Sequence, residues 1–108
     1  MKVSEVSKIL NNWMPTSIAE DFDNVGLIVG NPESLVTNIL ITLDTTNEVI
    51  NEAVKKNCNL IISHHPIIFG GISSINSSHW VGRVIQKAIS NNINIYAIHT
   101  NLDNIKEG

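Results

Sequence analysis

The sequence predicts an α/β fold with a parallel or mostly parallel sheet, βαβ crossovers and an N-terminal helix. Three observations predict it: short apolar runs rich in β-branched residues, helical periodicity between those runs, and turn residues at the boundaries. Strands that alternate with helices indicate a parallel sheet, because a right-handed helical crossover brings the next strand back in the same direction. At 108 residues the chain has room for one such core and no second complete domain.

The first third of the chain predicts one helix and one short strand. Apolar residues recur at helical spacing over residues 2–12, and Pro15 ends any helix there. The apolar residues Val25, Leu27 and Val29 alternate along residues 25–29, with Gly26 among them and Gly30 directly after them. This pattern is typical of a short strand at a sheet edge or a bend.

The remainder repeats a strand and helix pattern. Residues 38–43 form a β-branched apolar run, residues 46–56 have helical spacing, and residues 60–63 form a second apolar strand. A polar loop then leads to a predicted helix over residues 80–90 and a strand over 93–98. The carboxyl ends of these strands should meet at one edge, where ligand sites of open parallel sheets form.

Composition limits the classes of function. The formal net charge is -3 and the seven basic residues are scattered, so no patch for nucleic-acid phosphates is expected. No apolar run approaches membrane-spanning length, and residues 3–13 lack the apolar core of a signal peptide. The single cysteine, Cys58, cannot form an internal disulfide, and this favours the cytoplasm. Its position before an apolar strand fits a turn residue better than a reactive thiol.

Two adjacent histidines, His64 and His65, follow the predicted strand 60–63. Neutral imidazole is the commonest nitrogen ligand of zinc, iron, nickel and copper in proteins, whereas a histidine pair that only caps a strand is the structural alternative. Because Pro66 restricts the residue before it to extended conformations, we expect His65 to point roughly opposite to His64. Each ring would then bind a different ion of a dinuclear site.

A second polar cluster follows the predicted strand 93–98. Asp103 is expected to turn back toward the sheet edge and to supply oxygen to the metal site. His99 is interpreted as a neighbour of the ligands or a substrate contact, or equally as an ordinary strand-end histidine. His79 is taken as a solvated loop residue. Asp44 has two readings, a catalytic residue or part of a helix N-cap region with the following threonines.

Four segments together resemble the Nif-three-like family, whose members are often called GTP cyclohydrolase I type 2 homologues. The segments are Ser63-His64-His65-Pro66-Ile67-Ile68-Phe69, His99-Thr100-Asn101-Leu102-Asp103, Asp23-Asn24-Val25-Gly26-Leu27 with Gly30, and Leu43-Asp44-Thr45-Thr46 followed by Glu48-Val49-Ile50. The similarity runs over nearly the whole chain, with these segments in the family's order.

The resemblance implies a dinuclear metal centre with His64, His65 and Asp103 as ligands. It implies two divalent ions, with Zn, Mn, Fe or Ni as candidates, in a homo-oligomer that forms a ring-shaped hexamer at full length. The family adds a further His and a bridging Glu from a C-terminal half. Residues 1–108 are therefore expected to be the N-terminal α/β metal-binding half of a two-part protein, with the C-terminal half absent.

Three functions fit these sequence features. The first is a metal-dependent hydrolase that acts on a nucleotide or phosphate-containing substrate, with metal-activated water as nucleophile. The second is a noncatalytic metal-binding or regulatory interaction protein, in which the metals are structural. The third is a fold without any metal. Catalytic residues are not assigned from the sequence.

Overall fold

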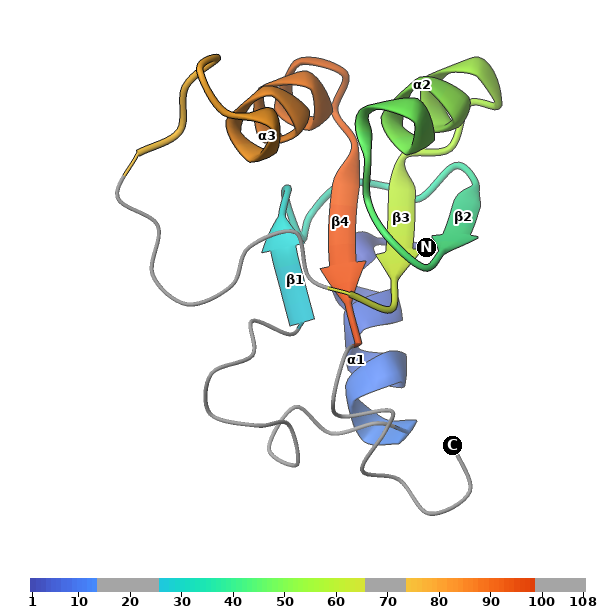
Figure 1. Cartoon of the computed structure of the whole chain (residues 1–108). Coiled ribbons are helices and arrows are strands. Elements are labelled where there is room, and N and C mark those ends of the chain that lie inside the picture. Colours follow the sequence, from blue (N-terminus) through green and yellow to red (C-terminus); the bar gives the residue numbers. More distant parts are fainter. Residues whose placement is uncertain (14–25, 66–73, 99–108) are drawn as a thin grey trace.

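The computed structural model describes residues 1–13, 26–65 and 74–98, and its elements form three layers (Figure 1). A four-stranded sheet lies in the middle, with two helices on one face and the N-terminal helix on the other. In chain order the elements are α1 (Val3–Trp13), β1 (Gly26–Val29), β2 (Ile39–Thr42), α2 (Asn47–Lys55), β3 (Leu60–Ser63), α3 (Trp80–Ser90) and β4 (Asn94–Ala97).

The sheet has the strand order β1-β4-β3-β2 and is mostly parallel, as predicted. β3 pairs in parallel with β2 on one side and with β4 on the other. β1 is an edge strand antiparallel to β4, with a register shift between Leu27 and Val29. Gly26 and Gly30 bound this strand with φ of 96° and 127°, which glycine adopts far more readily than other residues. The expected glycine-bounded strand is therefore confirmed at an edge.

Two apolar layers pack against the two faces of the sheet. Along β3, Ile61 packs on the side of α2 and α3, whereas Leu60 and Ile62 pack on the side of α1. β3 and β4 are buried at every position, because each has a strand on both sides and helices on both faces. The three parallel strands are thereby held in one register, and their carboxyl ends reach the same edge.

The helices α2 and α3 end in the same way. Each is followed by an asparagine in the left-handed region, Asn57 with φ 57° and Asn92 with φ 55°. The N–H of the next residue then donates to the helical carbonyl five residues back, at 2.8 Å in both cases. This is the Schellman arrangement, which satisfies carbonyls left open at a helix end and turns the chain into the following strand.

A buried asparagine ties the opposite, amino edge of the sheet together. Asn94 on β4 is 2% exposed, and its Oδ1 accepts a hydrogen bond from the backbone N–H of Asn31 at 2.7 Å. Its Nδ2 donates to the carbonyl of Asn59 at 2.9 Å. A Cβ at Gly30 would overlap the Asn94 amide, so this close approach requires glycine.

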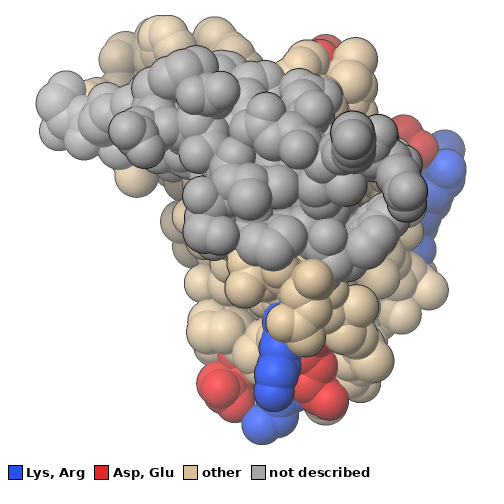
Figure 2. Space-filling model, turned by 90° about the horizontal axis from the view of Figure 1, so that it is seen from below, with Lys and Arg blue, Asp and Glu red and all other residues tan. Residues whose placement is uncertain are grey.

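The charged residues at the surface are mixed in sign. On the face seen in Figure 2, the described Lys and Arg side chains lie beside Asp and Glu. Lys2 pairs with Glu33 at 2.9 Å, and Lys56 pairs with Glu52 at 2.8 Å. Within the described part of the chain, no helix is long and apolar enough to cross a membrane.

Candidate metal centre

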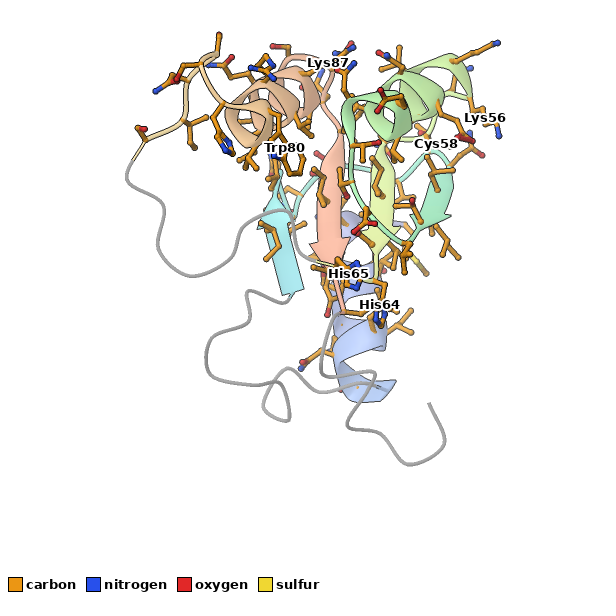
Figure 3. All side chains as sticks on the ribbon, in the orientation of Figure 1. Lys56, Cys58, His64, His65, Trp80 and Lys87 are labelled. Atoms are coloured by element: carbon orange, nitrogen blue, oxygen red, sulfur yellow. The ribbon has the colours of Figure 1, made fainter. Side chains whose placement is uncertain are left out.

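The histidine pair lies at the carboxyl edge of the sheet. β3 ends at Ser63, and His64 and His65 follow at once, both partly buried. Figure 3 shows the two rings near the lower ends of β3 and β4, away from Cys58 at the other end of the sheet. Strand polarity therefore places this part of the site where the sequence predicted it.

The two rings do not point apart, so that expectation is wrong. In a regular strand, successive N–H groups face opposite neighbours. Here the N–H of His64 donates to Thr42 O at 3.1 Å and that of His65 donates to Leu43 O at 2.9 Å, so both face the end of β2. The alternation stops because the chain bends after Ser63. The ring centroids consequently lie 4.9 Å apart, with the ring planes at 62°.

The hydroxyl of Ser63 stabilises this bend. Ser63 is fully buried, and its Oγ lies 2.6 Å from the carbonyl oxygen of His65 and 3.2 Å from that of Leu43. A serine hydroxyl has one hydrogen, so it donates to one of these carbonyls at a time. Either bond holds the bend next to the end of β2.

Asp44 is the residue that the sequence left open, and the structure places it in the site. Its Oδ1 lies 2.7 Å from Nδ1 of His65. The capping role belongs to Thr46, whose Oγ1 accepts from the N–H of Val49 at 3.3 Å at the start of α2. The signal available from sequence was position, because Asp44 follows β2 at the same edge as the histidine pair follows β3.

The other candidate ligands fall in different places. Asp103 and His99 lie outside the described residues, so their convergence with the histidine pair stays a prediction. Among residues 1–13, 26–65 and 74–98, no group of three or more His, Cys, Asp or Glu side chains is arranged to hold a metal ion. Within these residues the candidate ligands are the imidazoles of His64 and His65, and the Asp44 carboxylate lies beside His65.

Two further residues have structural roles. His79 is the N-cap of α3, and its Nδ1 accepts from the N–H of Val81 at 3.3 Å, a role that the sequence analysis missed. Cys58 is 7% exposed and packs into the core beneath α2 and α3, as a turn residue before β3. Neither takes part in the histidine cluster.

A cavity of about 530 Å³ opens between the first turns of α2 and α3. Thr46, which lines it, is two residues from Asp44. Its lining is mixed: Thr46, Asn47, Glu48, Trp80, Arg83 and Val84.

These features define an α/β protein with an imidazole pair and a carboxylate at the carboxyl edge of a mostly parallel sheet. A model of the Duf34/NIF3 (NGG1p interacting factor 3) family matches residues 1–108. The chain belongs to this family, which confirms the resemblance seen in its motifs.

Individual relatives agree with this assignment. The chain is 51% identical over 108 residues to a GTP cyclohydrolase 1 type 2 homolog of Clostridium acetobutylicum. It superposes with TM-score 0.91 and 47% identity on the crystal structure of Staphylococcus aureus protein SA1388, over 95% of this chain. Reduced HcgD from Methanocaldococcus jannaschii gives TM-score 0.90 and 30% identity over 100% of this chain.

The chain spans only part of the length of these relatives. It covers 40% of the Clostridium protein, 33% of the Staphylococcus chain and 43% of HcgD.

Proposed function

We propose that the protein binds two divalent metal ions through His64, His65 and Asp103, and uses them to hydrolyse a nucleotide or another phosphate-containing substrate. The observation that carries the proposal is the contact between the two imidazole rings at the carboxyl edge, with a carboxylate on one of them. The name of the Clostridium relative, GTP cyclohydrolase 1 type 2 homolog, supports a nucleotide as the class of substrate.

The chemistry fits the donors present. Imidazole nitrogens suit Zn, Fe and Ni, and a carboxylate adds the oxygen that Mn also accepts. Paired divalent ions supply a water of lowered pKa and polarise the group under attack. The ring centroids lie 4.9 Å apart, so both imidazoles can contribute to one site.

Metal content is the first test of the proposal. Elemental analysis of the protein, at the full length encoded by its gene, should find bound divalent metal. His64→Ala and His65→Ala should each lower that content, whereas His79→Ala removes an imidazole that caps α3 and should leave it unchanged. Equal metal content in all four proteins would contradict the metal site.

Catalysis and the number of ions need separate experiments. A screen of phosphatase and nucleotide-hydrolysis activity should find turnover that is lost in both histidine variants. Anomalous scattering from a metal-loaded crystal should show one ion beside each ring. Both imidazoles on a single ion would refute the assignment of two ions to the two histidines.

A second candidate is a noncatalytic metal-binding or regulatory interaction protein. The family description, NGG1p interacting factor 3, favours it because it names an interaction and no reaction. Metal bound without any hydrolytic turnover, in a coordination shell closed to exchangeable water, would support this alternative.

Assembly and location are part of the proposal. At full length we expect a homo-oligomer, a hexamer, in the cytoplasm, with no nucleic-acid partner and no association with membranes. Light scattering after size-exclusion chromatography measures the assembly, and any mass other than six subunits would contradict it.

A further inference from the structure

We infer that Asp44 is a positioning residue that fixes His65 in its Nδ1–H form, so that Nε2 is the nitrogen presented to metal. This inference rests on the proposed metal-binding function and assigns to Asp44 a role in the same site. It starts from the 2.7 Å separation between Asp44 Oδ1 and His65 Nδ1.

The hydrogen in this bond belongs to the imidazole. An ionised carboxylate has only acceptor lone pairs, so Nδ1 must be the donor. A neutral imidazole carries one N–H, and its other nitrogen then holds the free lone pair that a metal requires. For His65 that nitrogen is Nε2. Histidine ligands in metal sites commonly donate their second N–H to a carboxylate in this way, which sets both the tautomer and the ring orientation.

The backbone on both sides of this bond is held in place. The carbonyl of Asp44 accepts from the Thr42 hydroxyl at 3.0 Å, and two residues later Thr46 caps α2. On the other side, the His65 N–H bonds to Leu43 at 2.9 Å. The carboxylate and the ring are therefore carried by adjacent, mutually bonded strand ends.

An ordinary surface ion pair is the competing explanation. The side chains of His65 and Asp44 are 36% and 56% exposed, and exposed pairs of this kind contribute little to stability. If only charge mattered, removing any nearby carboxylate would weaken zinc binding, and the proton of His65 would not be fixed on one ring nitrogen. The tautomer of His65 is therefore the property that separates the two explanations.

The test uses the protein at the full length encoded by its gene. Nitrogen NMR of the imidazoles is recorded on the metal-free protein at mildly alkaline pH, where imidazole is neutral, with His65→Ala to assign the signals. Zinc affinity is measured by competition with a chromophoric chelator. The variants are Asp44→Ala, Asp44→Asn, which keeps an oxygen acceptor for Nδ1–H, and Glu48→Gln as a control. Glu48 is an exposed carboxylate in the first turn of α2.

We expect the Nδ1–H form of His65 in the wild type. In Asp44→Ala the ring should shift toward the Nε2–H form and zinc affinity should fall by about 10–100-fold, with Asp44→Asn between the two. Glu48→Gln should change neither property. The inference is overturned if His65 is already Nε2–H in the wild type, if Asp44→Ala leaves the tautomer unchanged, or if Glu48→Gln weakens zinc binding equally.

The metal site and the role of Asp44 can be refuted separately. If the wild type binds no zinc, the proposed function fails, and the tautomer in metal-free protein still decides the orienting role of Asp44. If the wild type binds zinc with His65 in the Nε2–H form, the metal site stands and the role of Asp44 is wrong.

Discussion

Replacing Gly30 by alanine should destabilise the fold strongly, because two separate costs meet at this position. Gly30 has φ 127°, and a non-glycine residue held in such a region costs about 1–3 kcal/mol. The new Cβ would also lie 2.7 Å from Cγ and 2.9 Å from Cα of Asn94, and overpacking of this kind costs about 1–3 kcal/mol. The free energy of unfolding should therefore fall by about 2–6 kcal/mol, a large part of the roughly 5–15 kcal/mol of an ordinary domain.

A double-mutant cycle separates the two costs. Asn94→Ala alone removes the hydrogen bonds to Asn31 and Asn59 and should cost about 2–4 kcal/mol. In Gly30→Ala/Asn94→Ala the obstructing amide is gone, whereas the backbone strain and the contact with Cα remain. The double variant should thus be more stable than the sum of the two single changes predicts, by about 0.5–3 kcal/mol.

Urea unfolding followed by circular dichroism measures each free energy, with the slope of the transition checked for constancy. The control pairs Gly30→Ala with Asn12→Ala, because Asn12 is exposed on α1 and the two costs should simply add. Additive effects in Gly30→Ala/Asn94→Ala would refute the close approach on which the reasoning rests.

Three further predictions concern single residues. Thr46→Ala should lower the free energy of unfolding by about 1 kcal/mol, because α2 loses its N-cap, and Thr46→Ser should largely restore it in the same urea assay. Burial raises the pKa of the Tyr96 phenol above its ordinary 10.0, so its contribution to stability is complete below about pH 10 and is lost as pH rises through the raised value. Phenolate absorbance follows this single tyrosine, and a titration at the ordinary pKa would contradict its burial. The Cys58 thiol, 7% exposed, should react with a thiol reagent slowly in the folded protein and fast in urea, and equal rates would place it outside the core.

The sequence by itself determined the elements and the edge at which the site lies. The helix Trp80–Ser90 and the strand Leu60–Ser63 have the bounds that periodicity predicted, because the spacing of apolar residues is a local property of the chain. The position of His64 and His65 followed from strand polarity, since parallel strands bring their carboxyl ends together. That Asp103 lies at the same edge remains a prediction from strand polarity.

The tertiary structure alone decided how the groups of the site face one another. Pre-proline geometry predicted that the rings of His64 and His65 would diverge, but that rule concerns one dipeptide and carries no information on the bend stabilised from Ser63 and the end of β2. The antiparallel direction of β1 likewise depends on its pairing with β4, far along the chain. Asp44 and His65 are 21 residues apart, and their contact exists only because β2 and β3 pair in register and end together. Periodicity describes which face a residue takes, whereas a hydrogen bond between two strand ends depends on the packing of the whole sheet.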